Sequence, residues 1–209
     1  MQESGISLRN LKGKKLLLHS CCAPCSGSIM YELKAADINF TVFYYNPNIH
    51  PHSEYEKRKE EIMKYAEKLA IPCIDLDYKD KTEWFERIAG LEDEPERGKR
   101  CSVCFDIRME RTAKYASGNG FNWFATTLGL SRYKDLAQVN QSGLQAALKY
   151  PEVNFLNYNW RSGGGLDRSK EINQLNNFYR QQYCGCIFSL MDANDNRKKK
   201  GRPLIKVRP

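Results

Sequence analysis

The stretch LLLHSCCAPCSG, Leu16 to Gly27, carries the strongest indication of the fold. It opens on a run that is short, apolar and without alternation, which is typical of a strand buried on both faces of a parallel sheet. Three cysteines, Cys21, Cys22 and Cys25, follow directly behind that strand. Ligands of such sheets bind beyond the carboxyl ends of the strands, where the strand order reverses. The stretch therefore predicts a functional site at the end of the first strand.

Strand-like and helix-like segments alternate along the rest of the chain. Strands are expected at 15–20, 40–45, 73–78, 123–127 and 153–158, and helices at 26–36, 53–70, 81–89, 101–117, 136–149 and 170–182. This alternation predicts an α/β fold with a doubly wound parallel sheet and helices on both faces. We expect a single α/β catalytic domain at 15–190, an N-terminal extension at 1–14 and a basic C-terminal tail at 191–209.

Composition limits where the protein works and what its cysteines do. The 209 residues suit one domain, and no apolar run approaches the roughly 20 residues that a membrane helix needs. The N-terminus lacks the apolar stretch of a secretion signal, so we expect a soluble, cytoplasmic protein with no membrane partner. In a reducing cytosol, clustered cysteines bind metal or carry out redox chemistry more often than they form structural disulfides.

The net charge of +8 is concentrated at the C-terminus. The segment RKKKGRPLIKVRP, Arg197 to Pro209, contains seven Lys or Arg and no acidic residue. Such a segment gains affinity for an RNA backbone from the release of counterions, and it equally suits a disordered, solubilising end. The segment alone favours neither interpretation.

Two further cysteine pairs follow the first group. In RCSVCFDIR, Cys101 and Cys104 are three residues apart and project to the same side of a helix, a side that Arg108 continues. In YCGCIFS, a disulfide between Cys184 and Cys186 would close a tight, strained ring, which is typical of an easily reduced, catalytic couple. The eighth cysteine, Cys73, stands alone in a predicted strand and is assigned no role.

The cysteine set leaves two metals to consider. Four thiolates suit zinc, but seven clustered cysteines exceed one zinc site, and none of the three histidines pairs with a cysteine at finger spacing. A 4Fe–4S cluster also takes four thiolates and, unlike zinc, changes its oxidation state. A cluster beside a dithiol forms a plausible electron relay, so the pattern favours iron–sulfur.

From about Lys15 to Ser189 the chain resembles the QueH family of epoxyqueuosine reductases. The resemblance is carried by HSCCAPC, YNPNIHP, RCSVCF, TTLGLS and YRQQYCGCIFS, in this order. It implies an adenine-nucleotide α-hydrolase-like, Rossmann-like fold and the reduction of epoxyqueuosine to queuosine at the wobble position of tRNA. It also implies a 4Fe–4S cluster, a second mononuclear iron beside it and an electron donor that the sequence does not identify.

The resemblance assigns roles to residues by motif. The cluster ligands it implies are Cys21, Cys22, Cys101 and Cys104, and the redox-active pair is Cys184 and Cys186. Cys25 and Asp106 are candidates for a second metal or for proton donation. Tyr183 is a candidate for stacking on the substrate base, and Arg108, Arg111, Arg161 and the basic tail are candidates for phosphate contact. Arg180 suits either a phosphate contact or a partner of a helix end. Asn159 stands where the family commonly has an acidic residue, so no carboxylate role is expected there.

Two other functions compete with this interpretation. An ATP-using tRNA thiolase shares the fold, but it has an SGGxDS-like loop after the first strand, where this chain has HSCCAPCSGS. The similar SGGGLDRS, Ser162 to Ser169, follows the fifth strand instead. A zinc-stabilised RNA-binding module is the non-enzymatic alternative, and metal content distinguishes it from the reductase.

Overall fold

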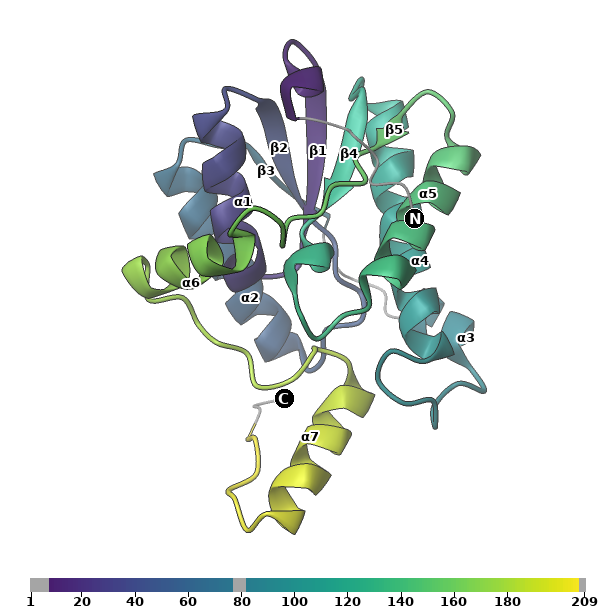
Figure 1. Cartoon of the computed structure of the whole chain (residues 1–209). Coiled ribbons are helices and arrows are strands. Elements are labelled where there is room, and N and C mark those ends of the chain that lie inside the picture. The colour runs from purple at the N-terminus through teal and green to yellow at the C-terminus, as the bar shows by residue number, and fades with distance from the viewer. Residues whose placement is uncertain (1–7, 77–81, 207–209) are drawn as a thin grey trace.

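The structure is a computed structural model that describes residues 8–76 and 82–206. Within these residues, five parallel strands form one sheet in the order β3-β2-β1-β4-β5 (Figure 1). The strands are β1 (Lys15–Ser20), β2 (Asn39–Tyr44), β3 (Cys73–Asp75), β4 (Trp123–Thr126) and β5 (Asn154–Phe155). Because β2 and β3 lie on one side of β1 while β4 and β5 lie on the other, the sheet is doubly wound, as predicted.

Helices and short 3₁₀ turns connect the strands. They are η1 (Leu8–Leu11), α1 (Ala23–Ala35), α2 (His52–Lys68), α3 (Thr82–Ile88), α4 (Lys99–Gly118), η2 (Leu128–Leu130), α5 (Leu136–Lys149), α6 (Gly165–Leu175) and α7 (Ile187–Lys199). No helix within the described residues is long and apolar enough to cross a membrane.

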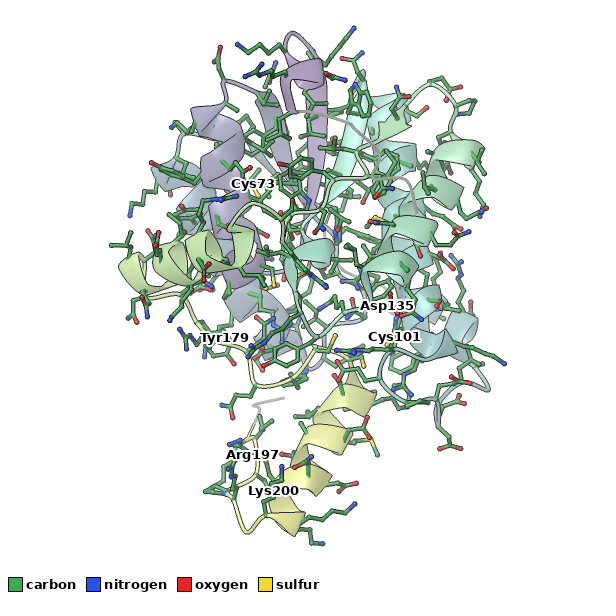
Figure 2. The ribbon with its side chains drawn as sticks, viewed as in Figure 1. Cys73, Cys101, Asp135, Tyr179, Arg197 and Lys200 are labelled. Carbon is green, nitrogen blue, oxygen red and sulfur yellow. The ribbon has the colours of Figure 1, made fainter. Side chains whose placement is uncertain are left out.

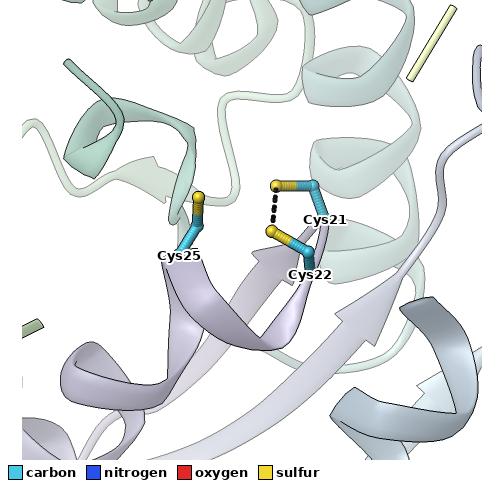
Figure 3. A group of neighbouring side chains, drawn as sticks. All are labelled: Cys21, Cys22 and Cys25. Atoms are coloured by element: carbon cyan, nitrogen blue, oxygen red, sulfur yellow. Dashed lines mark hydrogen bonds between the residues drawn. The ribbon is translucent and has the colours of Figure 1, made fainter. Parts of the chain in front are cut away.

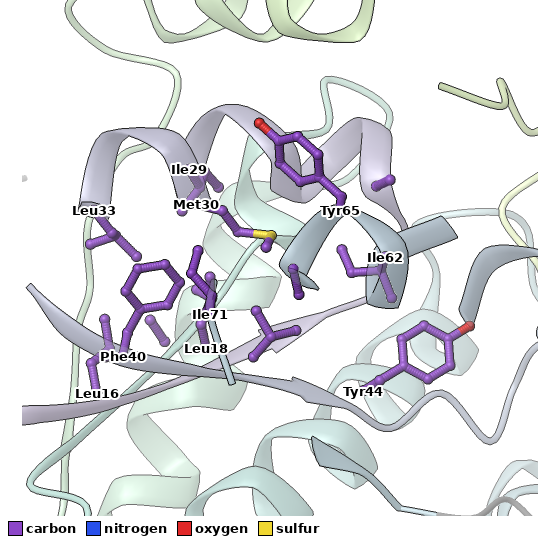
Figure 4. Close-up of a cluster of buried hydrophobic side chains, with 14 of the residues drawn as sticks. Leu16, Leu18, Ile29, Met30, Leu33, Phe40, Tyr44, Ile62, Tyr65 and Ile71 are labelled. Atoms are coloured by element: carbon purple, nitrogen blue, oxygen red, sulfur yellow. The ribbon is translucent and has the colours of Figure 1, made fainter. Parts of the chain in front are cut away.

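Each face of the sheet has its own apolar core. Leu16 and Leu18 of β1 pack into the cluster that contains Ile29 and Met30 of α1 and Ile62 of α2 (Figure 4). The intervening Leu17 packs on the opposite side, in a cluster with residues of α4 and α5. All three leucines are fully buried, and each such side chain stabilises the fold by about 1.5–3 kcal/mol. The unalternating apolar strand is therefore explained by burial on both faces.

Helix α1 begins three residues earlier than the predicted start at Ser26. Pro24 lies in its first turn, a position where the missing N–H of proline costs no hydrogen bond. Cys22 is consequently the residue that caps the helix, with an extended backbone, and Cys25 lies inside the first turn. This places the three clustered cysteines at the junction of β1 and α1.

The helix predicted at 170–182 is displaced toward the N-terminus. It begins at Gly165, after a turn in which Gly163 and Gly164 have φ values of 55° and 79°, and it ends at Leu175. A Cβ at Gly165 would lie 1.9 Å from the carbonyl oxygen of Trp160, so only glycine fits there. The segment that follows is irregular because side chains of α2 form hydrogen bonds with its backbone. Glu61, for example, accepts a hydrogen bond from the amide of Tyr179.

Two strand boundaries also differ from the expectation. β5 covers only part of 153–158, since the chain turns on itself between Phe155 and Asn157 (N to O, 3.1 Å). The strand predicted at 73–78 is confirmed for Cys73–Asp75, and its residues 77 and 78 lie outside the described residues. The expected domain boundary at residue 190 falls inside α7, which projects from the body of the molecule beyond the carboxyl ends of the strands (Figure 1).

Candidate active site

The strand order reverses between β1 and β4, and the candidate site lies at the carboxyl ends of these two strands. β1 leads directly into Cys21, while β4 leads into the loop that contains η2 and reaches α5 at Leu136. Segments leaving adjacent strands at a reversal point diverge, and the crevice between them is where such sheets bind ligands. The first cysteine group therefore lies where the sequence predicted it.

Cys21, Cys22 and Cys25 form one group of thiols (Figure 3), with all three sulfur atoms within 4.8 Å of one another. The sulfur atoms of Cys21 and Cys22 are 3.6 Å apart, and both side chains are buried. Hydrogen bonds from Cys22 and Cys25 lower the pKa of the Cys21 thiol well below its ordinary value. The hydrogen bond to Cys21, together with burial, raises the pKa of Cys22 to about 12. The group thus favours one thiolate held by two thiols.

Cys101 and Cys104 lie in the first turns of α4, outside the group of three sulfur atoms that lie within 4.8 Å of one another. Burial raises the pKa of Cys101 to about 11, and the neighbouring charges of Cys184, Cys104 and Cys186 add to this effect. The sulfur of Cys101 also accepts a hydrogen bond from the backbone amide of Arg97, at 3.2 Å. Because the charges of Cys184 and Cys186 affect the pKa of Cys101, the cysteine pair on α4 and the cysteine pair before α7 lie near each other.

Cys184 and Cys186 lie on either side of Gly185, and all eight cysteines of the chain are free thiols. Gly185 has a φ of 136°, and a Cβ there would lie 3.0 Å from Nη1 of Arg58, so glycine is required. Cys186 caps α7, its sulfur accepting a hydrogen bond from the amide of Ser189 at 3.4 Å. Burial raises the pKa of Cys186 to about 11.

Arg108 is a buried cation in contact with this site. Its Nε donates to the carbonyl of Cys104 at 3.2 Å, and its Nη1 lies 3.4 Å from Oδ1 of Asn46. Asn46 in turn donates to the carbonyl of Ser20 at the end of β1, at 2.9 Å. Within the part of the chain that the structure describes, Nη2 of Arg108 has no hydrogen-bond partner. This buried N–H is therefore available to a ligand or to a water molecule.

Lys134 is a second buried cation, and sequence reasoning missed it. Burial alone would lower its pKa, but charge interactions with Cys184, Cys21 and Cys25 outweigh that effect and raise the pKa above its ordinary value. Lys134 therefore lies among sulfur atoms from two distant segments of the chain. The available signal was topological: it follows β4, one of the two strands at the reversal point.

Arg58 supports the segment that carries the third cysteine pair. It is 1% exposed and forms an ion pair with Glu54 at 2.7 Å. Its other N–H groups donate to the carbonyls of Cys184 at 2.9 Å and Tyr183 at 3.2 Å. The irregular segment before α7 is thus fixed by one guanidinium of α2.

The remaining candidates from the sequence are placed differently. Asp106 projects about 200° around α4 from Cys104, away from the thiols, because an α-helix turns about 100° per residue. Tyr183 is buried and its hydroxyl donates to the carbonyl of His50, so its ring is not an open stacking surface. Arg180 is exposed. Arg161 donates to the carbonyls of Gly129, Ser131 and Lys134, at 2.7, 2.5 and 2.9 Å, which makes it a brace for the loop that carries Lys134.

The nearest histidine does not compete as a metal ligand. Both ring nitrogens of His19 are engaged, Nδ1 with Oγ1 of Thr126 at 2.9 Å and Nε2 with the carbonyl of Tyr45 at 3.1 Å. Burial lowers the pKa of His19 to about 3, so the ring is neutral. Cys73 lies apart from Cys101, within the sheet (Figure 2). The group of potential ligands that the described residues bring together consists of sulfur alone.

Comparison with solved structures confirms the fold. The U34-tRNA thiolase NcsA from Methanococcus maripaludis, solved with its [4Fe-4S] cluster, superimposes with a TM-score of 0.54 at 16% identity. The match covers 92% of this chain and 70% of the thiolase chain. At this identity the likeness concerns the fold only.

Comparison with curated sequences shows the family. A family model described as Epoxyqueuosine reductase QueH matches residues 16–192. Epoxyqueuosine reductase QueH of Histophilus somni (strain 129Pt) is 54% identical over 193 residues, covering 92% of this chain and 79% of the relative. The protein of the same name from Acinetobacter baylyi (strain ATCC 33305 / BD413 / ADP1) is 52% identical over 193 residues, covering 92% and 88%. The chain therefore belongs to the family of epoxyqueuosine reductase QueH.

Proposed function

We propose that this chain reduces epoxyqueuosine to queuosine at the wobble position of tRNA, the last step of queuosine biosynthesis. The observation that carries the proposal is the convergence of sulfur atoms from three chain segments beside two buried cations, Arg108 and Lys134, in a member of this family. Clustered thiols beside fixed cations suit a redox centre, and membership of the reductase family favours this interpretation over a zinc-binding module.

The donor set fits an iron–sulfur cluster. Thiolates from the β1–α1 junction and from α4 provide sulfur ligands, and we assign the cluster to Cys21, Cys22, Cys101 and Cys104. The two buried cations offset the negative charge that such a centre accumulates. When bound, the cluster would supply one-electron redox steps and an adjacent iron would supply Lewis acidity toward the epoxide oxygen. Cys25, inside the group of three thiols, is the candidate ligand of that second iron.

The third cysteine pair, Cys184 and Cys186, can supply the electrons and protons that the reduction consumes. Opening the epoxide to an alkene and water consumes two electrons and two protons. Oxidation of Cys184 and Cys186 to a disulfide releases two electrons and two protons, so one dithiol accounts for one product. An electron donor must then reduce the disulfide before the next turnover. Because Gly185 and Arg58 fix this segment, the two thiols lie ready beside the site.

The buried cations have an electrostatic role in this scheme. Lys134 keeps its proton at Nζ, and the Nη2 group of Arg108 has no acceptor among the described residues. Negative charge develops on the epoxide oxygen as its C–O bond breaks, and fixed cations stabilise such charge where water is excluded. The protons that form water come from the thiols.

Anaerobic incubation with epoxyqueuosine-containing tRNA and a chemical reductant, followed by nucleoside mass analysis, tests the proposal. We expect queuosine to accumulate over many turnovers with the iron-loaded protein. The variant that combines Cys184→Ser and Cys186→Ser should give no more than a single turnover. Cys73→Ser removes a thiol away from the site and should retain full turnover. Absence of queuosine with the loaded wild type contradicts the reductase, and sustained turnover by the double variant excludes the dithiol.

Metal analysis of anaerobically purified protein tests the cofactor separately. Iron and sulfide with a broad absorption near about 400 nm are expected for an iron–sulfur centre. A colourless protein that contains zinc on the same thiolates would instead support an RNA-binding module.

A further inference from the structure

The loop from Gly129 to Lys134 is held in one conformation by two arginines. Arg161 donates hydrogen bonds to three of its carbonyls. Arg97 donates to two more, from Nε to the carbonyl of Tyr133 at 3.0 Å and from Nη2 to the carbonyl of Arg132 at 3.1 Å. Five carbonyls of a six-residue loop are thus hydrogen-bonded to guanidinium groups. Loops ordinarily leave such groups to water, so this one is preorganised.

The same loop is linked to Cys101 through Arg97. The backbone amide of Arg97 donates to the sulfur of Cys101, and Gln138 donates to the carbonyl of Arg97 at 2.7 Å and to Oγ of Ser102 at 3.0 Å. At the end of the loop, Lys134 lies among the charges of Cys21 and Cys184. The loop therefore forms part of the rim of the candidate active site.

Tyr133, next to the buried Lys134, directs its ring outward and is 61% exposed. The guanidinium carbon of Arg132 lies 5.2 Å from the ring centroid, and its Nη2 donates to the tyrosine hydroxyl at 3.2 Å. Single exposed aromatic residues are common and need no explanation. Here, however, the ring combines a fixed backbone, an adjacent cation and a position beside the thiols.

We infer that Tyr133, with Arg132, is a stacking platform for an unpaired RNA base that flanks the reacting nucleotide. A wobble base can reach the thiols only if its neighbours in the anticodon loop lie at the rim. Proteins recognise such unstacked bases on aromatic rings, and an adjacent guanidinium adds charge that attracts the backbone. The inference rests on the proposed function for the identity of the RNA.

Binding of an anticodon stem–loop RNA with unmodified guanine at the wobble position tests the platform without any redox step. A 2-aminopurine next to the wobble base reports stacking by fluorescence quenching. We expect Tyr133→Ala to weaken binding by on the order of tenfold and to lose the quenching, as removal of one base–aromatic contact requires. Tyr133→Phe should bind like wild type. Tyr31→Ala on α1 removes a ring of similar exposure, 55%, and should change nothing.

Turnover then separates this inference from the proposed function. With epoxyqueuosine-containing tRNA, we expect Tyr133→Ala to raise KM with little change in kcat. If wild type reduces the substrate while Tyr133→Ala binds, quenches and reacts like wild type, the platform is wrong and the reductase stands. If Tyr133→Ala loses binding and quenching while loaded wild type forms no queuosine, the platform stands and the reductase is wrong. Equal losses in Tyr133→Ala and Tyr31→Ala also contradict the platform.

Discussion

Two groups of basic side chains in this chain have opposite surroundings. Arg58, Arg108 and Lys134 are 1%, 2% and 9% exposed and lie against thiols, backbone carbonyls or Glu54. The second group, which we call the arm cations, is exposed at the end of α7 and in the segment after it, and it consists of Lys198, Lys199, Lys200, Arg202 and Lys206. Among the residues that the structure describes, none of the arm cations forms an ion pair with a carboxylate.

Each cation adds one unit to the net charge whichever group it belongs to, but the two groups differ in what their charges act on. At an effective dielectric of about 20, two charges 4 Å apart interact by about 4 kcal/mol, against about 1 kcal/mol in water. Salt screens the exposed cations strongly and the buried ones weakly. The buried cations therefore act on the thiols under all conditions, whereas the arm cations act on another molecule only if it is a polyanion nearby.

The segment that carries the arm cations is ordered despite its composition. Arg197 donates from Nε to the carbonyl of Pro203 at 2.8 Å, and the side-chain oxygen of Asn194 accepts from the amide of Ile205 at 2.7 Å. The returning segment thus lies along α7, and Arg197 and Lys200 lie on the projecting part of the molecule (Figure 2). Cations in the last turn of a helix also interact favourably with its dipole.

The largest effect is expected from removing a buried cation that has a buried partner. Arg58→Met leaves the carboxylate of Glu54 buried, and it frees the carbonyls of Tyr183 and Cys184. Loss of one partner of a buried ion pair costs about 3–5 kcal/mol. We expect that decrease in the free energy of unfolding, measured by urea denaturation of the metal-free, reduced protein.

Arg87→Met is the matched control for this change. Arg87 pairs with Glu110 at 3.2 Å near the surface, where an ion pair contributes about 0–1 kcal/mol. Equal destabilisation by the two variants would show that burial does not determine how much an arginine ion pair contributes to the free energy of unfolding. The contrast between buried and exposed cations would then be wrong.

A smaller effect is expected at Lys134, which has charge partners but no buried carboxylate. Lys134→Met should leave iron uptake intact and lower the midpoint potential of the reconstituted cluster, because reduction adds negative charge that the ammonium stabilises. One charge acting over about 8 Å at an effective dielectric of about 20 contributes about 2 kcal/mol, which corresponds to tens of millivolts. Lys134→Arg should have a midpoint potential close to that of wild type, and Lys199→Met, which removes an arm cation, should have the same midpoint potential as wild type. A potential unchanged in Lys134→Met would place the lysine outside the electrostatics of the cluster.

The sequence indicated the candidate site by its cysteines and by Arg108, and it missed Lys134 for a physical reason. Thiols clustered at a strand end are rare enough to indicate chemistry, and the reversal of the strand order fixed where they lie. A buried lysine such as Lys134 looks like any surface lysine until the loop around it is known. Its burial depends on Arg161 and Arg97, which reach the loop from distant segments.

The segment before α7 was mispredicted for a related reason. Its residues from Lys170 to Gln182 have the composition of a helix, and local propensity is a weak guide where tertiary hydrogen bonds compete. Glu61 of α2 accepts a hydrogen bond from the amide of Tyr179, which a continuing helix would use, and Arg58 binds the carbonyls of the two residues that follow the predicted helix. By contrast, Leu136–Lys149 was predicted to the residue, because Asp135 caps it by accepting from Ala137 N at 2.8 Å.

The smallest effect is expected from the arm cations, and it should depend on salt. We expect the combined change of Lys198, Lys199 and Lys200 to Gln to weaken binding of the anticodon stem–loop RNA several-fold at physiological salt. The slope of log affinity against log salt should become shallower by about two to three, since each phosphate contact contributes about 0.7–0.9. Lys12, Lys14 and Lys15 provide a control with the same loss of charge, because they are exposed at the opposite edge of the sheet, before and at the start of β1. If the two triple variants lower the slope equally, the RNA responds only to net charge, and the position of the arm beside the carboxyl ends of the strands has no bearing on binding. If only the α7 triple variant changes the slope, the arm cations contact phosphates while the buried cations act within the site.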